Sequence, residues 1–519
     1  MRYPIGVQTF EEIINGEYVY VDKTDLVYNL ARGHICFLSR PRRFGKSLLL
    51  STLNAYFSGK KELFKGLKID NLEKDWTEYP VFRIDFAVGD YSKENELETI
   101  LNDILENWEL KYEVVCKTSS LGKRFNNILE AAEVKTGHKA VVLIDEYDKP
   151  MLDVLGTELE NKNRNTLKGF YGTFKSADEH LRFAFLTGVT KFSQVSVFSG
   201  FNQPDDISMD SRYDAICGIT EEELYKYFGE PVKQMAEVME CSEDEMKLKL
   251  KKQYDGYHFS KNLNLDIYNP FSIIKAFDKM EMESYWYESG TPTYLVKLME
   301  GHKVNMQKLT GRSYERKYFI DYRADKEDPL AMLDQSGYLT IKGYDREYNE
   351  YFLDFPNDEV RKGFVTLTAN SFFGKTEDEP DNWIKNLDRM LKRCDLDGVR
   401  KAFKSFLSSI PYEANKDERA KDFETHFSYT FYLIFRMLSC YTTLIEKQNS
   451  KGRADIIIET NNDIFIFEFK LDGSAEEALK QIEEQQYAVP YLNDKRKLHK
   501  IGVNISSASR TVDAWLVSE

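Results

Sequence analysis

Three consecutive residues, Gly45, Lys46 and Ser47, combine the groups that proteins use to hold a phosphate. They end a basic loop that follows the apolar run 35–38, and a stretch of helical character begins directly after them. In a strand–loop–helix layout, backbone N–H groups and the positive end of the helix dipole point at an anion. Lys46 would reach the β- and γ-phosphates of a nucleotide, and the Ser47 hydroxyl would bind Mg²⁺. The motif departs from the usual pattern at Arg40, which stands where its first glycine is expected.

A second motif supports the same ligand. The apolar run 141–144 is typical of a central strand in a parallel sheet, and it ends in Asp145 and Glu146. Acids at the carboxyl end of such a strand lie where open α/β sheets bind ligands. Asp145 would hold Mg²⁺ through its water, and Glu146 would orient or deprotonate the attacking water. With the loop cations Arg42 and Arg43, these residues predict a site for ATP and Mg²⁺.

Further strands are expected at 81–86 and 181–187, and their alternation with helices implies a parallel sheet. The second of these strands ends in polar residues. Thr187 or Thr190 could be a sensor near the γ-phosphate, although an ordinary threonine at a strand end explains either residue equally well. A strand between the phosphate-loop motif and the acidic motif leaves room for Glu146 beside Asp145, as in the AAA-like branch of P-loop ATPases.

The last hundred residues contain a different set of reactive groups. Strands are expected at 452–458 and 464–470, with Asp455 on the first and Glu468 and Lys470 on the second. Residues two apart in a strand share a face, so Glu468 and Lys470 point to the same side. Two carboxylates on one face form an oxygen site for Mg²⁺, which can generate hydroxide and polarise a phosphodiester. Lys470 would orient the water or stabilise the developing charge.

The spacing D-x12-E-x-K matches the PD-(D/E)XK nuclease core. A helix expected at 475–487 adds Gln481, a position often used in that superfamily. Glu424 or Glu446 could supply a further acid. The plain alternative is a two-stranded hairpin with an exposed glutamate and lysine.

The composition narrows the class of protein. The 519 residues suggest two to four domains, and 42% hydrophobic with 30% charged residues is typical of a soluble globular protein. Six scattered cysteines without a CxxC pair indicate a reducing compartment. No signal pattern and no apolar run near the ~18 residues of a membrane span are present, so a cytoplasmic protein without membrane contact is expected. The net charge of −15 argues against a wholly basic surface but leaves room for a local basic groove.

The whole chain resembles a bacterial family with an AAA-ATPase-like N-terminal domain and a PD-(D/E)XK nuclease-like C-terminal domain. Arg40 in place of the first loop glycine is usual in that family. The resemblance rests on YVDKT at 20–24, RPRRFGKS at 40–47, LIDEYD at 143–148, LTGVTKFS at 186–193, YWYESGTPTYL at 285–295, QSGYLTIKG at 335–343, FPNDEV at 355–360, GRADI at 452–456 and FEFK at 467–470.

The resemblance and the motifs together predict an α/β protein in three parts. These are an AAA-like P-loop ATPase domain at 1–215, a helical and winged-helix-like segment at 216–375, and a restriction-endonuclease-like α/β domain at 376–519. Within the middle segment, helical pieces followed by a β-hairpin, with strands expected at 337–341 and 351–355, resemble a winged-helix module. Such modules bind DNA, but in ATPases of this type they often pack on the nucleotide domain, which is the favoured interpretation.

The expected function is ATP binding and hydrolysis coupled to metal-dependent hydrolysis of nucleic acid, with DNA the first candidate substrate. Defence against foreign DNA or processing of mobile elements is the setting that analogy suggests. The alternative is a nucleotide-gated signalling or assembly ATPase whose C-terminal domain only binds. A third hypothesis is that the protein binds DNA through the winged-helix segment without cleaving it. The sequence leaves open whether the chain forms a homo-oligomer.

Overall fold

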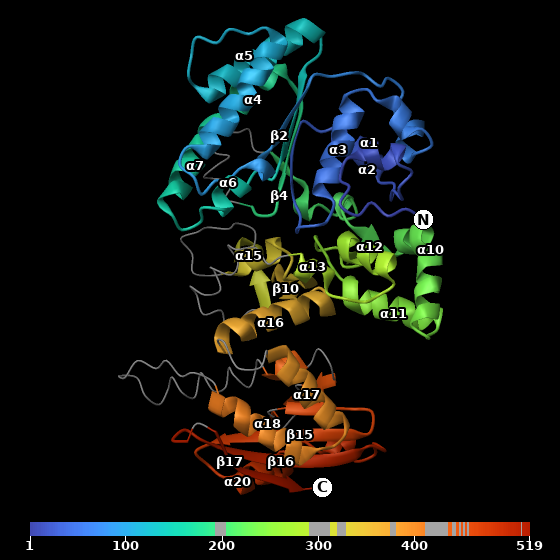
Figure 1. Cartoon of the computed structure of the whole chain (residues 1–519), viewed down its shortest axis with the longest axis vertical. Coiled ribbons are helices and arrows are strands. Elements are labelled where there is room, and N and C mark those ends of the chain that lie inside the picture. Colours follow the sequence, from blue (N-terminus) through green and yellow to red (C-terminus); the bar gives the residue numbers. More distant parts are fainter. Residues whose placement is uncertain are drawn as a thin grey trace. The chain divides into compact units, whose positions relative to one another are not determined.

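The computed structural model describes residues 1–191, 204–289, 312–318, 329–373, 380–409, 434–438, 443–445, 448–449, 452–453, 456–509 and 511–518. The chain divides into two compact units, Met1–Val360 and Arg361–Glu519. Each unit has its own five-stranded sheet (Figure 1). The first unit contains both the predicted nucleotide-binding motifs and most of the helical middle segment. The finer division into three domains at 215 and 375 remains a prediction.

The sheet of the first unit is parallel, as the alternation of strands and helices predicts. Its order is β2-β3-β4-β1-β5. The strands are β1 (Ile35–Ser39), β2 (Val81–Asp85), β3 (Ala140–Asp145), β4 (Leu181–Gly188) and β5 (Asp205–Asp206). β2, the intervening strand in the chain, lies at the edge of the sheet. It is β4 that separates the phosphate loop from the acidic strand, with Thr187 beside Leu38 of β1 and Leu186 beside Ile144 of β3.

Helices cover both faces of this sheet (Figure 1). On one side lie α1 (Phe10–Asn15), α2 (Thr24–Ala31) and α3 (Lys46–Phe57), and on the other α4 (Glu96–Tyr112), α5 (Leu121–Thr136), α6 (Lys149–Leu152) and α7 (Glu158–Tyr171). The short helix α8 (Thr173–Ser176) follows. The pattern in α4 shows why the helices pack this way: Leu97, Leu101 and Leu105 recur every four residues and are buried. Between the two layers every residue of β3 is buried.

The rest of the first unit is mainly helical. The α-helices described there are α10 (Glu221–Val238), α11 (Glu243–Tyr254), α12 (Pro270–Lys279), α13 (Tyr285–Glu288) and α15 (Leu330–Gln335), and β6 (Ile219–Thr220) pairs with β7 (Ile267–Tyr268). A capping box begins α10, because the Thr220 hydroxyl accepts from the backbone of Glu223 while the Glu223 carboxylate accepts from the backbone of Thr220.

The hairpin expected after α15 is confirmed as β9 (Thr340–Asp345) and β10 (Glu350–Asp354). A third strand, β8 (Arg312–Glu315), which the pattern does not predict, pairs with β10. The helix and hairpin pack within the same unit as the nucleotide motifs, and the backbone of Lys191 donates to the Gln335 side chain at 2.6 Å. The designation of this segment as a winged helix remains a prediction. Helix α16 (Asp358–Phe373) follows.

The second unit contains a mixed sheet in the order β11-β14-β15-β16-β17. Only β15 and β16 are parallel among these neighbours. The elements are α17 (Pro380–Lys392), α18 (Leu396–Ser409), β11 (Thr443–Ile445), β14 (Ile456–Glu459), β15 (Asp463–Leu471), α20 (Ala475–Glu484), β16 (Lys497–Ser506) and β17 (Thr511–Ser518), with a small pair β12 (Gln448–Asn449) and β13 (Gly452–Arg453).

The two faces of β15 contact different partners. Phe467 packs against Trp515, which in turn contacts Phe403 of α18. Ile464 and Ile466 point the other way, into a buried cluster with residues of α20 and the segment after it. Glu468 and Lys470 continue this second face, as their spacing predicts.

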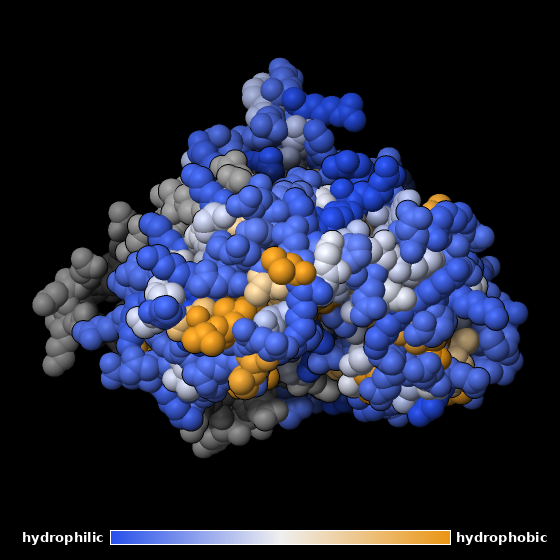
Figure 2. Space-filling model, turned by 90° about the horizontal axis from the view of Figure 1, so that it is seen from above, coloured by the Kyte–Doolittle hydropathy of each residue, from blue (hydrophilic) through white to orange (hydrophobic). Residues whose placement is uncertain are grey.

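Within the described residues, no helix combines the length and the apolar character that crossing a bilayer requires. Figure 2 shows one face of the molecule as mainly hydrophilic, with a small group of hydrophobic side chains near its centre.

Candidate nucleotide and nuclease sites

The phosphate loop joins β1 to α3 through a left-handed residue. Gly45 has φ +92°, a conformation that favours glycine, and it directly precedes the first residue of the helix, Lys46. The Lys46 ammonium is buried and donates to the carbonyls of Arg40 (3.0 Å) and Pro41 (3.1 Å). The lysine is therefore folded onto its own loop, where a phosphate would compete for it. Burial lowers the pKa of Lys46, and the neighbouring carboxylates of Glu146 and Asp145 oppose that shift.

The carboxyl end of β3 brings the predicted acids next to this loop. Asp145 is 2% exposed and accepts a hydrogen bond from Ser47, so the two expected Mg²⁺ ligands lie together. Burial raises the pKa of Asp145 and of Glu146, and Lys46 acts against both shifts. Glu146 has φ +48°, which costs a non-glycine residue on the order of 1 kcal/mol. Strain of this kind concentrates at functional positions.

A third acid in the same motif, Asp148, is one that the sequence pattern does not predict as a site residue. Its buried Oδ2 accepts from the backbone of Val189 (3.1 Å) and from both the backbone (2.6 Å) and the hydroxyl (2.7 Å) of Thr190. It therefore positions the chain that follows β4. The hydroxyl of Thr187 donates to the carbonyl of Leu38 at 2.9 Å. The hydroxyls of both sensor candidates, Thr187 and Thr190, are therefore engaged in hydrogen bonds within the protein. The sequence could not indicate these bonds, because each joins residues that are far apart in the chain.

The residue that replaces the first loop glycine anchors the loop. Arg40 is 1% exposed, and its guanidinium donates to the carbonyls of Ser39, Ser208 and Tyr213. It also lies 4.0 Å from the centre of the Phe259 ring. These contacts join the phosphate loop to the turn at 207–213 and to the middle segment, a structural role that glycine cannot fill.

We expect Arg40→Ala to cost about 3 kcal/mol of stability, because two buried carbonyls and one partly buried carbonyl lose a charged donor. Urea-induced unfolding measures this cost. Arg43→Ala is the matched control, since Arg43 belongs to the same loop, is exposed and lies 5.0 Å from the Phe271 ring. The control should change stability by less than about 1 kcal/mol. Equal effects of the two substitutions would contradict the anchoring role.

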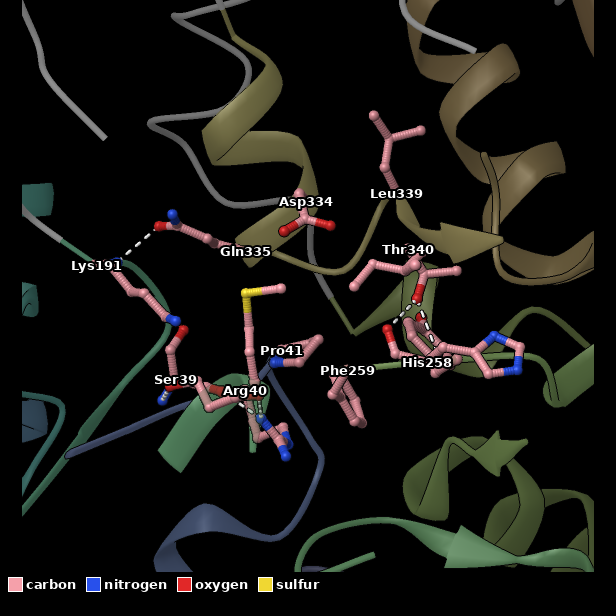
Figure 3. Close-up of a pocket in the computed structure, with 14 residues that line it drawn as sticks. Ser39, Arg40, Pro41, Lys191, His258, Phe259, Asp334, Gln335, Leu339 and Thr340 are labelled. Carbon is pink, nitrogen blue, oxygen red and sulfur yellow. Dashed lines mark hydrogen bonds between the residues drawn. The ribbon is translucent and has the colours of Figure 1, made fainter. Parts of the chain in front are cut away.

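A small cavity of about 50 Å³ lies behind the loop (Figure 3). It is lined by Arg40 and Pro41 on one side and by Asp334, Gln335 and Thr340 on the other. Burial raises the pKa of Asp334 to about 7. Residues of α15 and β9 therefore line the same cavity as residues of the phosphate loop.

The middle segment contacts the loop at a second point. The indole N–H of Trp286 donates to the carbonyl of Arg42 at 3.0 Å, and the Trp286 backbone donates to Glu359 at 2.7 Å. Arg43 has φ +66° and points its guanidinium toward Phe271. The two loop arginines therefore contact the middle segment, Arg42 through its backbone carbonyl and Arg43 through its side chain.

In the second unit, three of the four predicted nuclease residues come together. Glu468 is 2% exposed, and Lys470 Nζ lies 3.3 Å from its Oε1. Lys470 also donates to the side-chain oxygen of Gln481 on α20. Glu468 and Lys470 of β15 and Gln481 of α20 therefore form one polar cluster on one face of the sheet.

The predicted partner acid, Asp455, lies outside the described residues, as do Glu424 and Glu446. The next residue, Ile456, pairs with Phe467, which precedes Glu468 in β15.

Two described cations before and within β16 are paired with acids: Arg496, at the end of the sheet where β15 begins, and Lys500, whose strand neighbour is Ile466. Arg496 donates to Glu459 (2.9 Å) and Asp494 (2.7 Å), and Lys500 donates to Glu483 (2.7 Å). Their positive charge is therefore largely neutralised within the chain.

The donor sets fit the groups that the motifs imply. Ser47 and Asp145 offer a hydroxyl and a carboxylate, which suit Mg²⁺, and Lys46 supplies a cation for the phosphates of ATP. In the second unit Glu468 supplies one carboxylate for a divalent cation, with a lysine held beside it.

Fold and sites together define the class of protein: a P-loop ATPase-like domain and a restriction-endonuclease-like domain in one chain. Residues 4–198 match the family model described as a predicted AAA-ATPase, and residues 422–515 match that of the PD-(D/E)XK nuclease superfamily. A protein of Azotobacter chroococcum mcd 1, described as an uncharacterized protein in the vnfD 5′ region, is 34% identical over 527 residues, which span 99% of this chain and 98% of that protein. The chain belongs to the same family as that protein, with an AAA-ATPase-like domain followed by a PD-(D/E)XK nuclease domain.

Proposed function

We propose that the chain binds and hydrolyses ATP and that its nucleotide state controls metal-dependent hydrolysis of phosphodiester bonds in nucleic acid. The observation that carries the nuclease half is the contact of Lys470 with both Glu468 and Gln481 on one face of β15. A hairpin with two unrelated surface charges would not bury the glutamate or engage the helix glutamine.

In the nucleotide site, Lys46 would exchange the carbonyls of its own loop for the β- and γ-phosphates. Ser47 and Asp145 would hold Mg²⁺, which when bound neutralises charge on the phosphates. Glu146 would orient the attacking water and accept its proton. Arg42 and Arg43 would add positive charge, and the Thr187 hydroxyl would reach the γ-phosphate only by leaving Leu38.

In the nuclease site, Glu468 and Asp455 would hold Mg²⁺, which when bound supplies an activated water and polarises the phosphodiester. Lys470 would orient that water and stabilise the charge that develops on the phosphate. Gln481 would hold the Lys470 ammonium in place. DNA is the substrate we favour. The proposed setting, defence against foreign DNA or processing of mobile elements, predicts that cells carrying the protein restrict phage plating and that Glu468→Ala cells do not.

A nucleotide-gated signalling or assembly ATPase with a C-terminal domain that only binds is the second candidate. The observations that favour it are the net charge of −15 and the pairing of Arg496 and Lys500 with carboxylates, since unpaired cations attract a phosphate backbone.

The test is a cleavage assay with plasmid, linear and single-stranded DNA and with RNA, in Mg²⁺ or Mn²⁺, with and without ATP. It compares the wild type, Lys46→Ala and Glu468→Ala. We expect Glu468→Ala to lose cleavage. Lys46→Ala should still cleave, but its cleavage rate should no longer change when ATP is added. ATP turnover without cleavage of any substrate would overturn the nuclease and support the signalling candidate.

A further inference from the structure

Three side chains able to bind a metal meet in the second unit, away from Glu468 and Lys470. They are Cys394, Asp463 and His499, whose ligand atoms all lie within 4.8 Å of one another. Cys394 Sγ is 3.4 Å from His499 Nε2, and the same Nε2 is 2.8 Å from Asp463 Oδ1. A thiol, an imidazole and a carboxylate therefore converge on one point.

Separate elements deliver these groups. Cys394 follows the end of α17, Asp463 is the first residue of β15, and His499 belongs to β16. The imidazole stacks on the Phe465 ring at 5.1 Å between centroids. His499 is 4% exposed and Asp463 6% exposed, so two polar groups are held in the interior while the cysteine reaches the surface in part.

The backbone at Cys394 gives an independent indication that its side chain matters. Cys394 has φ +54° just after a helix end, a position at which glycine is strongly preferred. A side chain there costs on the order of 1 kcal/mol. The chain nevertheless places at this point the one group of the cluster that binds soft metals.

The contacts do not match a nucleophilic relay. In a Cys–His–Asp relay the histidine uses one ring nitrogen for the thiol and the other for the carboxylate. In this cluster both contacts are made by Nε2. A nitrogen that donates its proton to Asp463 cannot also accept one from Cys394.

The distances between the three ligand atoms match those expected around a bound cation. With Zn–S near 2.3 Å and Zn–N near 2.0 Å at tetrahedral angles, sulfur and nitrogen lie about 3.5 Å apart, and the nitrogen and a carboxylate oxygen about 3.3 Å apart. The observed distances are 3.4 Å and 2.8 Å, so a shift of about half an ångström would accommodate the ion. We propose that Cys394, Asp463 and His499 bind a divalent cation of the zinc type and tie α17 to β15 and β16.

This site differs from the nuclease site in place and in ligand chemistry. Asp463 lies on the Phe465 face of β15, whereas Glu468 and Lys470 lie on the face that contacts α20. The nuclease site offers oxygen ligands, which suit Mg²⁺, and the cluster offers sulfur and nitrogen, which suit Zn²⁺. A spectroscopic probe that detects sulfur ligation therefore separates the two.

The experiment titrates the chelator-treated full chain with Co²⁺ and follows the sulfur-to-cobalt charge-transfer absorption. We expect this band to saturate at a single cobalt per chain and to disappear when Zn²⁺ is added. Changes near metal ligands typically cost ten- to a hundredfold in affinity, so Cys394→Ser and His499→Gln should weaken Co²⁺ binding at least about a hundredfold.

Two control variants isolate the site. Cys116→Ser changes a partly exposed cysteine of the first unit, and Glu468→Gln changes the nuclease site, and both should keep the band. Absence of the band in the wild type, or an unchanged band in Cys394→Ser, would overturn the proposal. Circular dichroism verifies the fold of each variant. If His499→Gln does not fold, Asp463→Asn replaces it, because it removes the other buried ligand and should weaken Co²⁺ binding to the same extent.

Discussion

Replacing Glu468 by Gln should reduce cleavage of nucleic acid at least about a hundredfold. The substitution keeps the size of the side chain but removes the negative charge that would hold Mg²⁺, and it leaves Lys470 with a neutral neighbour. Initial rates of plasmid cleavage at saturating Mg²⁺ measure the effect. ATP turnover should stay within about twofold of the wild type, because the substituted group belongs to the other unit.

Glu476→Gln is the matched control for this prediction. Glu476 lies in the first turn of α20, is exposed, and belongs to the helix that carries Gln481. It loses the same charge close to the site, so its cleavage rate should remain near that of the wild type. A wild-type rate in Glu468→Gln would remove Glu468 from the reaction.

Glu146→Gln should slow ATP hydrolysis by about 10²- to 10⁴-fold while leaving ATP bound. The glutamate stands at the end of β3 in a strained left-handed conformation, beside Asp145 and within the electrostatic reach of Lys46. An amide can still contact water but cannot accept its proton. Phosphate release measures hydrolysis, and equilibrium binding of a fluorescent ATP analogue measures affinity.

Lys46→Ala provides the contrast, since it should lose binding as well as turnover. Glu158→Gln, at the exposed start of α7, should change neither quantity. Hydrolysis by Glu146→Gln at the wild-type rate would show that another group activates the water.

Local sequence determined the elements and the reactive groups because their signals are short-range. The apolar run that ends in Asp145 and Glu146, the glycine before Lys46 and the two-residue spacing of Glu468 and Lys470 each depend on backbone geometry over a few residues. The parallel sheet, the hairpin after α15 and the helix that carries Gln481 are confirmed on that basis, although α20 ends at Glu484 and not at 487.

Tertiary structure alone decided which groups meet across long separations. No local pattern indicates that β4 separates the two nucleotide motifs, that Arg40 donates to Ser208 and Tyr213, or that Asp148 holds Thr190. Likewise Cys394, Asp463 and His499 are scattered over a hundred residues and show no metal-binding spacing, yet the ends of one helix and two strands bring them together. Their meeting depends on strand order and helix packing, which follow from burying apolar surface over the whole unit rather than from any one segment.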